Sequence, residues 1–278
     1  MAIPVPALEN QSELLIGIEP EHNIFDQVER YRHLADYLSN QLGVEIKLTI
    51  MSRYGEVIKR FKSLRLDGAF LSPYTATMAI KELHLEPLVN PVNLNGESTT
   101  QGYIFVRKDS NIRSMADMKG GAIAFVDPST LEGYLFPLVF LKQHGVNNIN
   151  GFFNRTYFTG SHASTIYAVL DGRADIGAAK STVYKRLVKN DPSIGEELGI
   201  LAESVKVPEF TLCIRSEIDQ DLRERLSDIL LHMKETPEGR KVLQQFEAQA
   251  FIKSSKDDFT IIERMAQEAL GTLTVHGE

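Results

Sequence analysis

The chain has 278 residues, of which 43% are hydrophobic and 24% charged, as in ordinary globular proteins. This length buries one large core or two modest ones. The net charge of −7 and the scattered basic residues exclude nucleic acid and anionic membrane surfaces as favoured partners. The sequence contains no run of eighteen apolar residues, so we predict no membrane span. Residues 1–6 have no signal-peptide pattern, so we expect a cytoplasmic protein or a mature exported domain whose leader has been removed.

The single cysteine, Cys213, excludes an internal disulfide and a multi-cysteine zinc site. It lies in the apolar run 211–214, which is typical of a buried strand, so we predict a small core side chain. His162 has no companion at metal-ligand spacing. The sequence therefore predicts neither a metal nor another cofactor.

The first part of the chain alternates strands with helices. We predict strands over 14–18, 44–50 and 69–71, and helices over 54–64 and after Ser72-Pro73. A further helix follows the polar loop 19–26 and ends at Gly43. This alternation favours a parallel α/β sheet.

A second unit repeats this plan. Short strands at 122–126 and 175–178 alternate with helices, which we predict over 115–118, 131–143, 165–170 and 181–188. Residues 62–72 and 169–179 share one form: a helix end, a turn, an Asp, a short strand and a loop that opens a helix. The repeat predicts two related α/β lobes.

Extended segments at 103–107 and 210–215 follow the two units, and the chain beyond them is predicted to be helical to its end, over 219–233, 239–248 and 259–270. We therefore expect two α/β lobes joined by two extended hinge segments: a first lobe over 1–106, a second over 107–210, and a return to the first lobe with C-terminal helices over 211–278. Strand ends of both lobes then face one cleft, where open α/β sheets bind ligands.

One candidate ligand loop spans 127–133 (Asp-Pro-Ser-Thr-Leu-Glu-Gly), between a strand and a helix. The amide groups of a helix N-terminus favour anions, and the hydroxyls of Ser129 and Thr130 add donors. The alternative is a helix cap alone, with Ser129 or Thr130 as the cap residue and Glu132 in the first turn.

Two more loops of this kind follow strands. In residues 158–162, Ser161 and His162 are candidate donors to a ligand, and Ser161 as a simple helix cap is the alternative. In the Ser72-Pro73-Tyr74 loop, proline suits the first turn of a helix. Both loops therefore enter the candidate site.

Tyr54 and Lys180 complete the candidate cleft. Tyr54 starts its helix and either forms a wall of the cleft or packs internally. Lys180 ends a strand and either pairs with an anion or is a solvated surface residue. Dinucleotide, Walker, G-x-S-x-G and H-E-x-x-H patterns are missing from the sequence. Four polar loops without a catalytic set predict a binding cleft that catalyses nothing.

These loops, in their order, resemble the phosphate/phosphite/phosphonate-binding proteins of ABC transporters, the PhnD-like group. The resemblance rests on motifs that run through nearly the whole chain: Tyr54, 67–69 leading to Ser72-Pro73, 106–110, Asp127-Pro128 with 133–137, 160–162 and 169–177. It implies a type II periplasmic binding fold, export to the periplasm or another extracytoplasmic space, and hinge closure over a small polar, anionic ligand. It also implies an ABC transporter permease as partner.

The phosphate motif departs from the family pattern. The family commonly has D-P-x-S-T-S-G, and the three hydroxyl positions are here Thr130, Leu131 and Glu132. A carboxylate ~4 Å from a dianionic phosphonate repels it by an energy on the order of several kcal/mol at an effective dielectric of about 20. A different small ligand, with a group that donates to Glu132, therefore stays open.

Further positions differ from the family, among them a tyrosine that is replaced around Ala76. A tyrosine before the hinge strand aligns near Thr100, which we include among the ligand residues, and acidic residues that meet a ligand amino group in some members align with Thr182 and Phe210. Two other functions stay open. One is that of a ligand-sensing domain of a membrane signalling protein with the same fold. The other is that of an enzyme that uses His162 and Glu132 as an acid–base pair.

Overall fold

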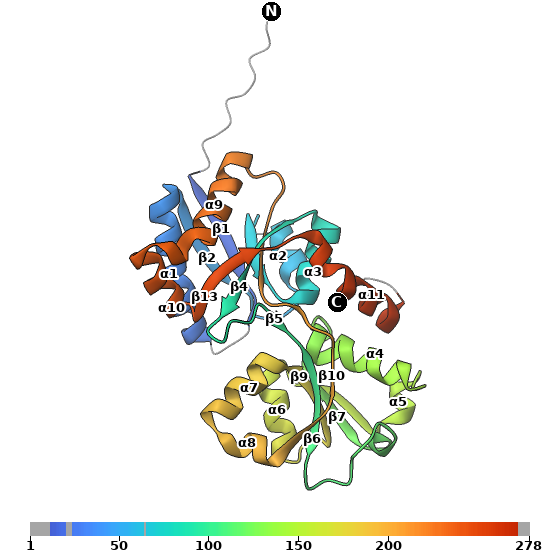
Figure 1. The fold of residues 1–278 in the computed structure, drawn as a ribbon. Coiled ribbons are helices and arrows are strands. Elements are labelled where there is room, and N and C mark those ends of the chain that lie inside the picture. The colour runs from blue at the N-terminus through green and yellow to red at the C-terminus, as the bar shows by residue number, and fades with distance from the viewer. Residues whose placement is uncertain (1–11, 21–23, 64, 272–278) are drawn as a thin grey trace, which may run out of the picture.

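The structure is a computed structural model that describes residues 12–20, 24–63 and 65–271, folded into two α/β lobes (Figure 1). Three expectations fall wholly or partly outside these residues: the start of the chain at 1–6, the polar loop 19–26 and the helix end at Leu64. Within the described part, no helix is long and apolar enough to cross a membrane.

The first lobe is built on a six-stranded mixed sheet in the order β13-β4-β12-β3-β1-β2. Its strands are β1 (Glu13–Ile18), β2 (Glu45–Ile50), β3 (Gly68–Leu71), β4 (Glu86–Asn93), β12 (Thr211–Ile214) and β13 (Ala248–Lys253). β1 pairs in parallel with β2 and β3, whereas β12 is antiparallel to both β3 and β4. The expected parallel sheet is therefore correct for β1–β3 and wrong for the other half, where returning strands add antiparallel pairs.

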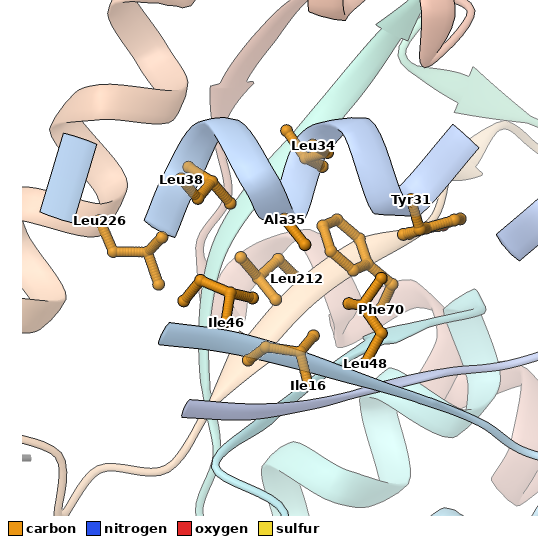
Figure 2. A pocket seen from close by; sticks show the side chains of 10 residues that line it. All are labelled: Ile16, Tyr31, Leu34, Ala35, Leu38, Ile46, Leu48, Phe70, Leu212 and Leu226. Atoms are coloured by element: carbon orange, nitrogen blue, oxygen red, sulfur yellow. The ribbon is translucent and has the colours of Figure 1, made fainter. Parts of the chain in front are cut away.

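Helices cover both faces of this sheet (Figure 1). They are α1 (Ile24–Leu42), α2 (Val57–Ser63), α3 (Pro73–Leu83), α9 (Gln220–His232), α10 (Pro237–Gln245) and α11 (Thr260–Leu270). Apolar residues recur in α1 every three to four positions, and Figure 2 shows Tyr31, Ala35 and Leu38 of this helix lining the space beside the strands. The cavity between them measures only about 10 Å³ and is lined by apolar side chains, so this space is core and does not bind solutes.

The second lobe is built on a five-stranded sheet in the order β10-β6-β9-β7-β8. Its strands are β6 (Gly102–Arg107), β7 (Ala122–Phe125), β8 (Arg155–Phe158), β9 (Ile176–Lys180) and β10 (Leu198–Glu203). Its helices are η1 (Ala116–Met118), the π-helix η2 (Leu131–Leu135), α4 (Phe136–Gln143), α5 (Ile149–Phe152), α6 (His162–Leu170), α7 (Ser181–Asn190) and α8 (Pro192–Glu197). The order β8-β7-β9-β6 repeats β2-β1-β3-β12 of the first lobe, as the sequence repeat predicts.

The chain crosses between the lobes in a short antiparallel ribbon, β5 (Thr99–Thr100) with β11 (Val207–Pro208). The extended segments expected at 103–107 and 210–215 exist, but as β6 and β12 inside the two sheets, a few residues beyond the crossing. A third connection is helical, because α11 packs on α3 of the first lobe and on α4 of the second (Figure 1).

The expectation that the C-terminal part is helical to its end is wrong. The strand β13 lies between α10 and α11 and pairs with β4. The sequence predicted neither of these two strands. Short 3₁₀ turns, η3 (Met233–Glu235) and η4 (Lys256–Phe259), flank this region. The predicted core role of Cys213 is confirmed, since the residue is fully buried in β12 and burial raises the pKa of its thiol.

The core of the second lobe leaves no room for a side chain at Gly177. A Cβ there would lie 2.7 Å from Phe105 and from Val169. We expect Gly177→Ala to lower the free energy of unfolding by about 1–3 kcal/mol through overpacking. Urea denaturation measures this effect. Gly199→Ala, where the nearest atoms belong to the flexible side chain of Lys108, is the control, and equal stabilities of the two variants would contradict the packing argument.

Candidate functional site

His162 begins α6 in the second lobe and is almost completely buried. Ser161 caps this helix by accepting a hydrogen bond from the Ser164 amide at 3.1 Å, which confirms the cap interpretation of Ser161. The backbone amide of Lys180 donates to Nδ1 of His162 at 3.1 Å. The neutral imidazole therefore carries its proton on Nε2, which is a donor.

Tyr54 joins the first lobe to this histidine. It precedes α2, is 6% exposed, and its ring meets the His162 ring edge-to-face with centroids 6.0 Å apart. The sequence-predicted residues Tyr54 and His162 thus come together across the cleft, from opposite lobes.

Lys180 is buried at the C-terminal end of β9 and is 1% exposed, so the solvated alternative is wrong. Its Nζ forms an ion pair with the carboxylate of Glu209, whose side chain is 12% exposed. The same nitrogen lies 4.4 Å from the centroid of the Phe210 ring, in cation–π geometry.

Glu209 and Phe210 are fixed to the first lobe through their backbone. The Glu209 amide donates to the carbonyl of Ser98 at 3.0 Å, and the Asn90 side chain of β4 donates to the Glu209 and Phe210 carbonyls at 3.3 and 3.4 Å. The pair of Lys180 with Glu209 therefore spans the lobes beside the hinge.

The loop 127–133 is organised by Asp127. Its carboxylate accepts from the Ser129 amide at 2.8 Å, and its carbonyl accepts from the Thr130 hydroxyl at 2.7 Å. Thr130 stands at the N-cap of η2, one of the two expected cap positions, but its side chain makes no cap hydrogen bond. Burial raises the pKa of Asp127, against the hydrogen bonds from Ser129 and the charge of Arg53 from the first lobe.

Glu132 lies in the interior beside Lys180, and two glycines make this possible. A Cβ on Gly133 would lie 2.4 Å from Val126, and a Cβ on Gly102 would lie 3.2 Å from the Glu132 backbone. Gly102 is also the residue that pairs with Lys180 between β6 and β9. Glu132 is 1% exposed, so its carboxylate enters the buried part of the site.

Sequence reasoning did not identify Glu19 as a functional residue. It follows β1, is fully buried, and accepts hydrogen bonds on Oε2 from the Ser72 amide at 2.7 Å and the Thr75 hydroxyl at 2.6 Å. Burial raises the pKa of its carboxyl to about 7, although these hydrogen bonds and the Gly55 amide act in the opposite direction. An acidic residue directly after an apolar strand was the available signal.

The other predicted residues have different surroundings. Ser72 contacts Thr75, with their hydroxyl oxygens 2.9 Å apart, and its amide is engaged by Glu19. Tyr74 lies in the apolar cluster under α3, and burial, then the charge of Glu82, raises its pKa to about 12. Thr100 lies in the hinge, 3.5 Å from the Ser181 hydroxyl.

A groove of about 380 Å³ opens between the lobes next to Glu209 and Phe210. Four basic residues line it, Arg30, Lys185, Arg186 and Lys189, together with acidic Glu97, Glu209 and Glu247. Small-molecule sites measure ≈ 300–1,000 Å³. The groove is therefore of the size of a small-molecule site and borders Glu209, the carboxylate of the ion pair.

The raised pKa of Glu19 predicts a pH-dependent stability. The carboxyl titrates at 4.5 when unfolded and at about 7 when folded, so the protonated folded state is favoured below pH 4.5 and this contribution is lost as the pH rises to 7. Glu19→Gln removes this loss. Between about pH 4 and pH 8, we expect its stability relative to wild type to increase by roughly 3 kcal/mol.

Urea denaturation over this pH range measures the difference. Glu82→Gln, which removes an exposed carboxylate of α3, is the matched control. A stability difference between Glu19→Gln and wild type that stays constant with pH would show that folding does not shift the pKa of Glu19.

The chain is similar to several known proteins. A family model described as "ABC transporter, phosphonate, periplasmic substrate-binding protein" matches residues 16–259. The probable ABC transporter phosphite binding protein of Prochlorococcus marinus is 23% identical over 274 residues, which cover 95% of this chain and 92% of that protein.

Two solved structures have the same fold. The binding protein component of an ABC phosphonate transporter from Pseudomonas aeruginosa has a TM-score of 0.80 and 22% identity, covering 92% of this chain and 86% of its own. A Prochlorococcus marinus protein in complex with methylphosphonate has a TM-score of 0.80 and 21% identity, covering 93% and 98%. They confirm the predicted type II periplasmic binding fold. The chain belongs to the family of periplasmic substrate-binding proteins of phosphonate ABC transporters.

Proposed function

We propose that this protein binds a small solute with a phosphonate-like oxyanion between its lobes and delivers it to the permease of an ABC importer. The observation that carries the proposal is the meeting of Tyr54 and His162 across the cleft. The Lys180 amide donates to Nδ1 and so fixes the imidazole with its proton on Nε2, and both Tyr54 and His162 match the family motifs.

In this proposal the second lobe supplies most of the donors to the oxyanion. Ser129 and Thr130 lie at the start of a helix, whose amides favour anions, and the ammonium of Lys180 adds a positive charge. Tyr54 closes over the ligand from the first lobe. Ser72, Tyr74, Thr100, Ser161 and Glu132 complete the proposed set, with Ser72, Thr100 and Ser161 supporting the loops around the ligand.

The class of solute follows from the relatives. One is named for phosphite and another is bound to methylphosphonate, so we propose a phosphorus oxyanion of this size as the first ligand to test. Glu132 in the altered motif keeps a second class open, namely solutes that also donate to a carboxylate. Its burial supports this second class, because a buried carboxylate is stabilised by donors.

We further propose that the protein binds without catalysis, outside the cytoplasm, with a second lobe inserted into the first between the crossing strands β5 and β11. The family consists of transport proteins, which favours an importer component over a sensor domain. The enzyme hypothesis needed His162 to exchange protons with Glu132. Nδ1 of that ring already accepts from the Lys180 amide, so this nitrogen does not serve as the base.

A ligand screen tests the proposal. Phosphate, phosphite, methylphosphonate, sulfonates and small amino compounds are titrated calorimetrically, and saturable binding of one class is expected. Tyr54→Phe should weaken that binding roughly 10- to 100-fold, since it removes one hydroxyl donor to a charged group. Tyr167→Phe, an exposed tyrosine of α6, should leave the affinity unchanged. No saturable binding of any solute by the wild-type protein would overturn the transport function.

A further inference from the structure

The ammonium of Lys180 already has a carboxylate partner inside the cleft. Lys180 ends a strand of the second lobe, and Glu209 is fixed to the first lobe by Ser98 and Asn90. Both side chains are withdrawn from solvent, with exposures of 1% and 12%. The chain itself therefore provides an anion that contacts both the lysine and the opposite lobe, which is the position that a bound solute would otherwise take.

The buried side chains of this region carry more carboxyl groups than ammonium groups, which disfavours an anionic solute. Glu132 and Glu209 supply two carboxylates and Lys180 one ammonium, and Glu19 adds a third carboxyl on the first lobe. A solute oxyanion that approaches Lys180 meets the Glu209 carboxylate at the same nitrogen. Like charges at this distance, in a site of low dielectric, repel strongly.

We propose that the Glu209 carboxylate is an internal competitor of the solute, which occupies the Lys180 ammonium and thereby sets the affinity of the cleft for anions. The inference rests on the proposed function, because it assigns Lys180 to the solute's oxyanion. Glu209 is then a specificity-determining residue outside the loops that the sequence singled out.

Two features allow the solute to exchange with Glu209. The groove of about 380 Å³ reaches both Glu209 and Phe210, so solutes and water have access to the pair from the hinge side. The Phe210 ring, 4.4 Å from Nζ, contacts the ammonium independently of the carboxylate. Lys180 is therefore still positioned in the cleft when its carboxylate partner is displaced or neutralised.

The test removes the competing charge and preserves the shape. In Glu209→Gln the Lys180 ammonium loses the Glu209 carboxylate, so one negative charge fewer opposes an added anion at this buried nitrogen. We expect this variant to bind inorganic phosphate or methylphosphonate roughly 10- to 100-fold more tightly than wild type in calorimetric titrations. A gain in affinity is not expected from a residue with a merely structural role.

Two controls accompany this variant. Glu97→Gln removes a carboxylate on the rim of the same groove, where Glu97 pairs with Lys185 at 3.6 Å, and should leave anion affinity unchanged. The double variant Lys180→Gln with Glu209→Gln removes both charges and should lose the gain. If Glu209→Gln does not fold, Glu209→Asp, which keeps the charge and shortens its reach, should show a smaller gain in anion affinity.

The outcomes separate this inference from the proposed function. Tighter anion binding by Glu209→Gln, lost again in the double variant, supports the competitor role, even if wild type binds no anion measurably. Unchanged or weaker anion binding by Glu209→Gln, with a wild-type protein that binds a solute, overturns the competitor role and leaves the transport function standing. If neither protein binds any solute of the panel, both ideas are overturned.

Discussion

The buried ammonium of Lys180 is the constraint on which the rest of the cleft depends. Removing a lysine from water is costly unless a carboxylate and further contacts compensate for the lost hydration. Glu209 and the Phe210 ring supply that compensation from the first lobe, and the Lys180 amide in turn fixes the imidazole of His162. The contact between the lobes beside the hinge thus follows from the Lys180 side chain, and the tautomer of the candidate ligand donor follows from the backbone amide of the same residue.

The backbone around this lysine is built for close approach. At Gly102 and Gly133 any side chain would collide with neighbouring atoms, so these glycines let η2 lie against β6 and β7. The first turn of η2 is a π-helix, in which the Leu135 amide donates to the carbonyl of Thr130. This close packing places Glu132 in the interior, and the same packing would place a hydroxyl residue at this position beside an oxyanion.

Local patterns predicted the strands and loops of both lobes, since short apolar runs such as 69–71 and 122–126 end in polar helix starts. They did not predict β4, because Pro87 and Pro91 argue against an internal strand. The structure accommodates these prolines with irregular pairing near both of them. β13 was missed between the helices predicted over 239–248 and 259–270, since only its pairing with β4 makes residues 248–253 extended.

The sequence predicted some residues of the site and missed others for a different reason. Tyr54, His162 and Lys180 were predicted because each stands at a strand or helix end, where topology alone directs residues to the cleft. Glu209 was not predicted, because its importance lies in a contact with a residue 29 positions earlier and in a hinge crossing that a local pattern does not encode. The ligand class depends on the sum of such contacts. A family motif predicts which loops lie together in the fold. The net charge of the cleft depends in addition on single substitutions in those loops, such as Glu132.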